Sequence, residues 1–131
     1  MIFVNLPVRD LAASTAFYVA LGGMVNSQFS GERSSSIVFS DAIGVMLLTH
    51  GRNREFSKRP IADACRESHA LFALSVDNRD MVDATLRCAI AAGGKGDRNP
   101  VQDQGWMCNR SAEDPNGYFW EVMWMDAAAT K

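Results

Sequence analysis

The strongest constraint on the fold of this chain is an internal repeat, in which a strand-like segment and a helix-like segment recur in the same order. Val8 and Val76 end the two strand-like segments and are 68 positions apart. Gly22 and Gly93 follow the two helix-like segments and are 71 positions apart. Because a repeated segment is one structural unit that packs against its neighbour, we predict two tandem units with the order βαβββ.

The first copy contains the pattern of a complete unit. Residues 2–8 alternate between two faces, which predicts a strand. Asp10 then suits the N-cap of a helix whose apolar residues recur at helical spacing until Gly22-Gly23 ends it. Three further strands are predicted at residues 24–27, 34–39 and 44–49.

The second copy repeats this order. A strand over residues 70–76 precedes a helix over residues 79–92, which stops at Gly93-Gly94. The turn sequence DPNG at residues 114–117 joins the last two strands. These two strands are predicted at residues 104–111 and 118–125.

The stretch over residues 51–68 is polar and irregular, so it is predicted to connect the two units, with a short helix around residues 61–65. Neither unit can bury its sheet alone. We therefore predict one α+β domain over residues 1–131, with units at about 1–50 and 69–126.

Composition excludes several classes of protein. With 13 Lys and Arg against 15 Asp and Glu, the net charge is −2, which gives no reason to expect a nucleic acid or an anionic membrane as partner. The three cysteines have no CxxC spacing, which argues against a disulfide framework or a zinc knot and favours the reducing cytoplasm. The longest apolar stretch, residues 42–48, is too short to cross a bilayer.

Two motifs near opposite ends of the chain resemble a known family. Residues 4–11 (VNLPVRDL), with Ser14 and Phe17-Tyr18, resemble the start of vicinal oxygen chelate proteins, and residues 113–121 (EDPNGYFWE) resemble their final turn and strand. This superfamily includes glyoxalase I, extradiol dioxygenases and fosfomycin and bleomycin resistance proteins. The resemblance implies a cup-shaped, barrel-like mixed sheet with helices outside. It does not define one activity, because the fold supports many chemistries.

The resemblance also implies where a metal ion would bind. Metal-using members place His, Gln or Glu ligands on the first and last strand of each unit. Matching the strands puts the four positions at Phe3, Leu47, Leu71 and Glu121. Three of these side chains are apolar, and one carboxylate cannot hold a divalent cation in the usual geometry. We therefore expect no metal and no other cofactor.

A shifted register leaves an alternative open. His69 lies two residues before Leu71 and would share its strand face, so His69 and Glu121 could form a relocated divalent metal site with Asn5 as a weak third ligand. The simpler interpretation of His69 is a partly exposed residue at a strand end.

Glu121 is the main candidate for chemistry. Strand alternation places Phe119 and Glu121 on the face opposite Trp120, so Glu121 points into the cup if the tryptophans pack under the helices. A carboxylate there needs a partner, and Arg110 is the expected one. The pair could be structural, could orient a ligand, or could leave Glu121 as a general acid or base. Cys108 is expected to be a small buried hydrophobe rather than a thiolate activated by Arg110.

Our first hypothesis is a small-molecule-binding protein of this superfamily that lacks the usual metal site. The expected pocket residues are Phe3, Asn5, Leu47, His69, Leu71, Trp106, Cys108, Arg110, Phe119 and Glu121. The alternative is an enzyme, either a lyase or dioxygenase of glyoxalase type with a relocated metal site or a metal-free acid–base enzyme using Glu121. A third hypothesis is a filled cup that serves as an interaction module. We expect a homodimer in each case, because the fold leaves sheet edges to be covered.

Overall fold

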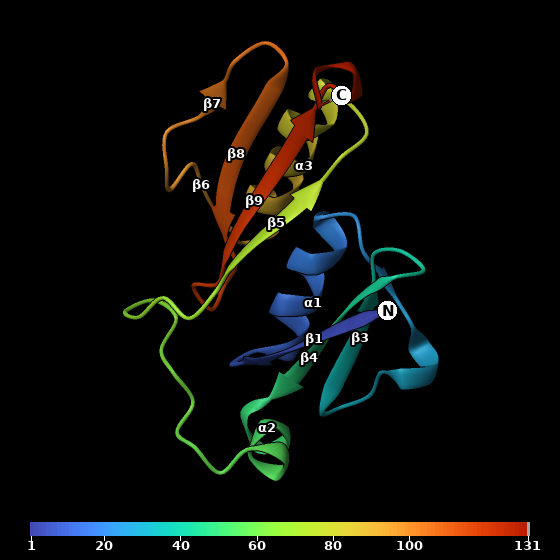
Figure 1. The fold of residues 1–131 in the computed structure, drawn as a ribbon. Helices are drawn as coiled ribbons and strands as arrows, with labels where there is room; N and C mark the ends of the chain where they lie inside the picture. Colours follow the sequence, from blue (N-terminus) through green and yellow to red (C-terminus); the bar gives the residue numbers. More distant parts are fainter. Residues whose placement is uncertain (131) are drawn as a thin grey trace.

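The computed structural model describes residues 1–130 and contains the two predicted βαβββ units (Figure 1). The first unit comprises β1 (Ile2–Val8), α1 (Leu11–Ala20), β2 (Met24–Val25), β3 (Ser34–Val38) and β4 (Ile43–Thr49). The second comprises β5 (Leu71–Ser75), α3 (Arg79–Ala91), β6 (Lys95–Gly96), β8 (Met107–Glu113) and β9 (Phe119–Met125). The remaining elements are the 3-10 helix η1 (Ser27–Phe29), α2 (His50–Phe56), β7 (Gln102–Asp103) and the 3-10 helix η2 (Ala127–Thr130).

Each unit forms its own mixed sheet. The strand orders are β1-β4-β3-β2 and β5-β9-β8-β6, with β7 also paired to β8. The β1/β4 and β5/β9 pairs are parallel and the others are antiparallel, which confirms the α+β class. The two sheets do not close into a barrel, because β1 and β5 each pair along one edge only within residues 1–130.

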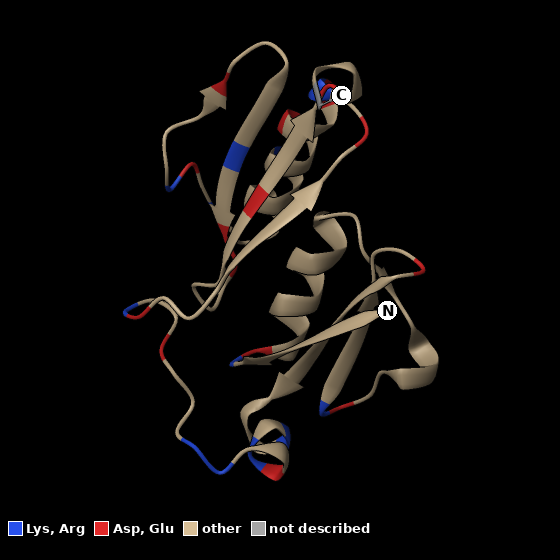
Figure 2. Cartoon of the chain, viewed as in Figure 1, with Lys and Arg blue, Asp and Glu red and all other residues tan. Residues whose placement is uncertain are grey.

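Charge is unevenly distributed between the units. The strands of the first sheet and α1 contain no Lys, Arg, Asp or Glu, and they are uniformly tan in Figure 2. The second sheet has Lys95 in β6, Asp103 in β7, Arg110 and Glu113 in β8 and Glu121 in β9. Within residues 1–56, all charged side chains therefore lie in the loops or in α2.

The predicted helix boundaries are confirmed by their caps. The Asp10 carboxylate accepts a hydrogen bond from Ala13 N at 3.0 Å, and the Asn78 side chain accepts one from Met81 N at 3.0 Å. Gly22 and Gly93 follow the helices with φ of 108° and 102°. Residues with a side chain rarely adopt this left-handed region, so glycine at both positions allows the chain to leave each helix.

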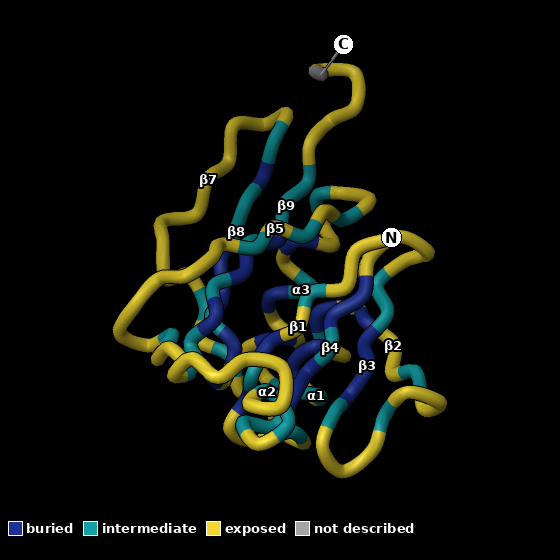
Figure 3. Tube along the Cα trace, turned by 60° about the horizontal axis from the view of Figure 1, so that its bottom comes forward, coloured by how far each residue is buried: buried dark blue, intermediate teal, exposed yellow. Residues whose placement is uncertain are grey.

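The connection between the units differs from the prediction. Residues 61–65 are not helical, since 61–63 have no regular structure and 64–66 form a turn; α2 forms earlier in the chain, where Thr49 Oγ1 accepts a hydrogen bond from Arg52 N at 3.2 Å. The Asp63 carboxylate accepts a hydrogen bond from Cys65 N at 3.0 Å, and such a local bond competes with helix formation. Most of residues 57–70 are exposed, as the yellow stretch that follows α2 in Figure 3 shows.

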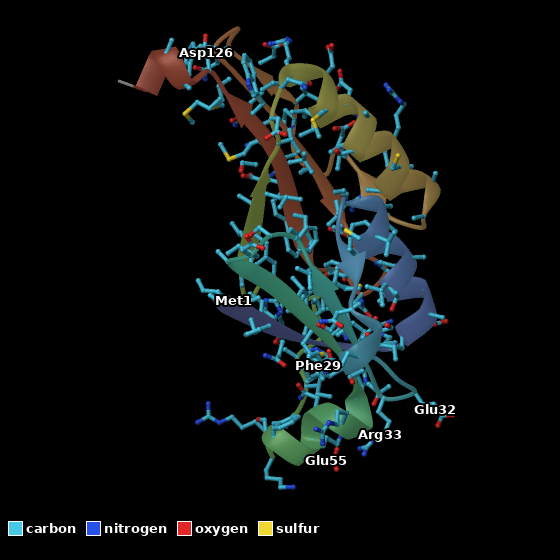
Figure 4. All side chains as sticks on the ribbon, turned by 90° about the vertical axis from the view of Figure 1, so that its right-hand side faces the viewer. Met1, Phe29, Glu32, Arg33, Glu55 and Asp126 are labelled. Atoms are coloured by element: carbon cyan, nitrogen blue, oxygen red, sulfur yellow. The ribbon has the colours of Figure 1, made fainter. Side chains whose placement is uncertain are left out.

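The helices α1 and α3 lie on the same side of the two sheets (Figure 4). Their buried side chains join those of both sheets in one hydrophobic core, to which Phe17, Leu86 and Val122 each contribute a fully buried side chain. The opposite face of each sheet, which we call its open face, is covered by neither α1 nor α3. No helix within residues 1–130 has the length and apolar composition needed to cross a lipid bilayer.

A buried polar network joins the two units. Asp114, in the turn between β8 and β9, is only 3% exposed, and its carboxylate accepts hydrogen bonds from the Tyr18 hydroxyl at 2.8 Å and from Asn116 Nδ2 at 3.0 Å. It also accepts from the backbone N–H groups of Asn116 and Tyr118, both at 2.8 Å. The Tyr18 oxygen in turn accepts from Trp120 Nε1 at 3.1 Å.

The same turn is bonded to the start of the chain. Asn116 Oδ1 accepts from Arg9 N at 3.0 Å, and Asn116 Nδ2 donates to Ser14 Oγ at 3.0 Å. The Tyr118 hydroxyl donates to Pro7 O at 2.6 Å. The turn therefore attaches the second unit to β1 and α1 of the first.

Burial shifts the titration of the groups in this network. It raises the pKa of Asp114, raises the pKa of Tyr18 well above its usual value, and raises that of Tyr118 to about 12. The neighbouring Asp114 carboxylate adds to the rise at both tyrosines. Both hydroxyls therefore stay protonated and remain hydrogen-bond donors at neutral pH.

We predict that Tyr18→Phe lowers the free energy of unfolding by about 2 kcal/mol, because it removes a buried hydrogen bond to a carboxylate and leaves Trp120 Nε1 without its acceptor. Chemical denaturation of the two proteins measures the difference. Thr15→Val is the matched control, since it removes a hydroxyl hydrogen bond to Leu11 O from the same helix at a part-exposed position. An equal loss in both variants would contradict a special role for the network.

Candidate ligand-binding site

The open face of the first sheet contains a hollow of about 430 Å³. Strands β1, β3 and β4 form its floor, and η1 forms one side. The lining residues are Met1, Phe3, Asn5, Asn26, Phe29, Ser36, Val38 and Met46. Two of the predicted pocket residues, Phe3 and Asn5, therefore share one hollow.

Glycine makes room for the largest side chain of this hollow. Phe3 lies directly opposite Gly44 in the β1/β4 register, and a Cβ at Gly44 would be only 3.0 Å from Phe3 Cδ1. The ring therefore lies across the backbone of β4, where a side chain would crowd it. It remains 56% exposed, so one side of the ring is available for contact with a ligand.

The side wall is fixed to the sheet by hydrogen bonds. Asn26 N donates to Ser36 O at 2.8 Å, and Ser36 N donates to Ser30 Oγ at 3.0 Å. The Asn26 side chain also caps η1 by accepting from Gln28 N at 3.1 Å. These bonds hold Phe29 beside the sheet, so the hollow is formed before any ligand arrives.

The side chains that line the hollow are uncharged. No Lys, Arg, Asp, Glu or His side chain within residues 1–130 lines it, and its polar groups are the side chains of Asn5, Asn26 and Ser36. Apolar walls with a few neutral hydrogen-bonding groups suit an uncharged ligand, because a charged one would lose hydration without gaining a partner.

The open face of the second sheet carries Leu71, Phe119 and Glu121, as predicted from strand alternation. Asn109 Nδ2 donates a hydrogen bond to Glu121 Oε2 at 3.2 Å. A cavity of about 20 Å³ next to this pair is closed by residues 99–102 and is about large enough for one water molecule. Glu121 therefore lies in a narrow polar niche rather than in a ligand-sized cup.

Arg110 does not pair with Glu121, so that expectation is wrong. Its guanidinium donates to Asp97 at 2.7 and 3.0 Å and to Asp83 on α3 at 3.0 Å. In the β8/β9 register Arg110 lies opposite Val122, which faces the core, whereas Ser111 lies opposite Glu121. The hydrogen bonds from Arg110 lower the pKa of Asp97, and the same carboxylate raises the pKa of Arg110.

Leu47 and Cys108 lie in the hydrophobic core rather than on an open face, with exposures of 0% and 5%. The buried position of Cys108 agrees with its interpretation as a small hydrophobe. On β4 the residue that lines the hollow is Met46, one position before Leu47. Because adjacent strand residues point to opposite faces, a shift of one position in the strand alignment moves the side chain from the cup to the core.

His69 lines a cavity of about 230 Å³ together with Leu71 and Phe119 of the second open-face group, whereas Trp106 lies apart from both groups. The His69 ring stacks on the Tyr118 ring, with centroids 4.9 Å apart and an angle of 20° between the planes. Trp106 precedes β8 and is 42% exposed, and its carbonyl oxygen accepts from Asp126 N at 2.7 Å. The predicted pocket residues on open faces thus form two groups, Phe3 with Asn5 on the first sheet and Leu71, Phe119 and Glu121 on the second.

Sequence reasoning missed most of the walls of the hollow. Met46 could have been found by shifting the strand alignment by one residue, and Ser36 and Val38 by assigning a face to β3. Asn26 and Phe29 belong to the loop before β3, and the sequence contains no periodic signal that places a loop beside a sheet. The residues missed are Met1, Asn26, Phe29, Ser36, Val38 and Met46.

The residues on the open faces do not fit a divalent metal ion. The four strands that supply ligands in metal-using members carry Phe3, Met46, Leu71 and Glu121 at their open faces. Within residues 1–130, no three His, Cys, Asp or Glu residues cluster closely enough to hold a metal. His69 and Glu121 line different cavities.

Comparison with known proteins defines the class. A sequence profile of the Glyoxalase/Bleomycin resistance protein/Dioxygenase superfamily matches residues 2–122. The chain therefore belongs to this superfamily, as its two terminal motifs indicated. No curated protein sequence matches it significantly.

Solved structures show the same fold. A glyoxalase/bleomycin resistance protein/dioxygenase family enzyme from Burkholderia phytofirmans PsJN has a TM-score of 0.75 at 18% identity, covering 94% of this chain and 96% of its own. A glyoxalase-related enzyme from Fulvimarina pelagi has a TM-score of 0.76 at 20% identity, covering 95% and 86%. The fosfomycin resistance protein FosX from Mesorhizobium loti has a TM-score of 0.72 at 14% identity, covering 99% and 95%.

We predict that the protein purified without chelator contains no stoichiometric metal, because only Glu121 among the four open-face positions offers a metal ligand. Elemental analysis followed by titration with Ni²⁺, Zn²⁺, Mn²⁺ and Fe²⁺ measures this. Glu121→Ala is expected to bind each ion as weakly as the parent protein does. One equivalent of metal that is lost in Glu121→Ala would contradict the prediction.

Proposed function

We propose that this protein binds a small, uncharged and largely apolar molecule in the hollow of the first sheet, without a metal ion. The observation that carries this proposal is the preformed cavity of about 430 Å³ with aromatic walls and no charged side chain among its lining residues. This volume lies within the range of roughly 300–1,000 Å³ that is common for ligand pockets.

The superfamily supports a binding role as well as a catalytic one. Its name includes bleomycin resistance proteins, and one structural relative is named for fosfomycin resistance. Sequestration requires only a complementary pocket, and the hollow supplies one with Phe3 and Phe29 as aromatic contacts. Asn5, Asn26 and Ser36 can orient a ligand through neutral hydrogen bonds.

We predict that neutral aromatic fragments such as indole bind saturably and shift the backbone amide signals of Phe3, Ser36 and Met46 in two-dimensional NMR spectra. Asn5→Asp is expected to weaken binding about tenfold, because it adds a charge that must lose water when a neutral ligand enters. Asn53→Asp, which makes the same change on α2, is the control and should bind as the parent does. Shifts confined to residues outside the hollow would contradict the proposal.

The environment of Glu121 supports a second candidate function, that of a metal-free acid–base enzyme. Its carboxylate has one neutral side-chain partner, Asn109, and lies on an open face. Glu121→Gln separates the two candidates in the same titration. Unchanged fragment affinity would support binding in the first sheet alone, and weaker binding would indicate that the functional site includes Glu121.

We also propose a homodimer in which a second copy covers the free edges of β1 and β5. These edge strands expose large apolar side chains, with Ile2 59% and Leu71 70% exposed. Exposed apolar edges commonly mark contact surfaces. The three cysteines are all free thiols, which supports a reducing, cytoplasmic location.

We predict that Leu71→Asp converts the dimer to a monomer in sedimentation measurements, because the new charge would be buried between copies. Val101→Asp is the matched control, since Val101 is also exposed, at 50%, but lies in the loop before β7. A parent protein that sediments as a monomer at all concentrations would rule out this interface.

A further inference from the structure

A second cavity, of about 480 Å³, lies between the end of β1, the helix α2 and residues 60–64 of the connection. It shares no lining residue with the hollow of the first sheet. Its ionisable lining residues include Arg9, His50, Arg54 and one carboxylate, Asp63, and Ile61 is among its apolar ones. We propose that this cavity binds a small organic anion, whose phosphate or carboxylate group is held by Arg9 and Arg54.

The α2 wall of the cavity is fixed to the first sheet. Glu55 accepts hydrogen bonds from Arg33, just before β3, and from Arg52 at 3.1 Å. Figure 4 shows Arg33 and Glu55 next to each other at the end of the molecule that α2 occupies. Thr49 caps the helix through Arg52 N, and Thr49 N donates to Arg33 O at 3.0 Å. Arg54 therefore projects from a helix with a defined position.

The opposite wall is fixed to the turn of the buried network. The Cys65 thiol donates to Asn116 O at 3.3 Å, and Asp63 pairs with Arg9 at 3.4 Å. The connection packs directly on Gly117, where a Cβ would be only 2.8 Å from Cys65 N. The backbone of Arg9 is held by its bond to Asn116. Both cationic residues thus belong to walls with specific tertiary contacts.

The charge of this region favours an anion. Residues 50–59 contain four Arg or Lys and one Glu, a local charge of +3 in a chain of net charge −2. Figure 2 shows the basic residues gathered at α2 and the start of the connection. An anion that approaches the cavity is therefore attracted to this end of the molecule.

Both guanidinium groups have hydrogen-bonding capacity to spare. Within residues 1–130 no carboxylate forms an ion pair with Arg54. The Arg9 guanidinium has two long contacts, both through Nη2, to Asp63 Oδ1 at 3.4 Å and to Cys65 Sγ at 3.9 Å, and the side chains of Arg9 and Asp63 are about half exposed. A solvated pair of this kind contributes little and is readily exchanged for a better acceptor. An incoming anion would therefore find two guanidinium groups available.

The remaining walls indicate an organic anion rather than a bare ion. A guanidinium offers two parallel N–H groups that match the oxygens of phosphate or carboxylate. Pro60, Ile61 and Ala62 provide an apolar wall, and Tyr118 contributes an aromatic side chain. The Tyr118 hydroxyl is bonded to Pro7 O, its ring stacks on His69 and the residue is only 3% exposed, so residues 60–62 supply most of the apolar contact. This combination fits a molecule with one anionic group and a compact apolar body.

The test is an NMR titration of the full chain with phenyl phosphate, benzoate and inorganic phosphate at constant ionic strength. We expect phenyl phosphate or benzoate to bind saturably, to shift the amides of Arg9, Arg54 and residues 61–64, and to bind more tightly than inorganic phosphate. The comparison of phenyl phosphate with benzoate identifies the preferred anionic group. Absence of saturable binding by all three probes would overturn the proposal.

Arg54→Gln and Arg9→Gln are each expected to weaken binding of the preferred probe about tenfold or more. Arg59→Gln is the matched control, because it removes the same charge from the connection without lining the cavity. Unchanged binding in Arg59→Gln supports the site, whereas equal weakening in all three variants shows nonspecific charge attraction and overturns it.

Thermal unfolding of each variant verifies that the fold is retained. Arg54→Gln is the variant least expected to affect stability, because the Arg54 side chain takes part in no ion pair within residues 1–130. Weaker probe binding in Arg54→Gln with unchanged thermal unfolding therefore supports a direct contact between this guanidinium and the anion. Unchanged binding in this variant would contradict the proposed role of Arg54.

Discussion

The arrangement of the two units depends on one buried carboxylate. Asp114 receives four hydrogen bonds, three from its own turn and one from Tyr18 on the helix of the other unit. Leaving this buried carboxylate without its hydrogen-bond donors would cost free energy. The turn and the helix therefore stay together. The bond from Trp120 to Tyr18 extends the network into β9. The relative position of the two sheets, and hence of the cavities that they line, follows from this contact.

Placing both helices on one side of the sheets has a functional consequence. The helix-covered faces merge into one core, and the open faces remain accessible. The two open faces differ in chemistry, because the first has a hollow lined by uncharged side chains while the second carries Glu121 in a niche about the size of a water molecule. The cationic cavity beside α2 is different again and lies outside both faces. One small fold thus presents three chemically distinct environments.

The sequence predicted the repeat, the cap at Asp10 and the glycine ends of both helices, because these features depend on local spacing. It placed Phe3 and Glu121 on open faces, since strand alternation is also local. The prediction was wrong for Leu47, because a one-residue shift of the strand alignment moves a side chain from the cup to the core. It was also wrong for Arg110, whose hydrogen-bond partners come from distant segments. It also missed Phe29 and the cavity beside α2, because both depend on where loops pack in three dimensions.

The close packing of the connection on Gly117 affects how the two units are held together. Residues 57–62 are mostly exposed and contribute little to the core, whereas residues 63–65 are bonded to the turn that also holds β1 and α1. Covalent continuity through residues 57–62 is therefore not what keeps the two units together. A chain cleaved within that stretch would remain a noncovalent complex of its two halves, since the contacts between them lie elsewhere.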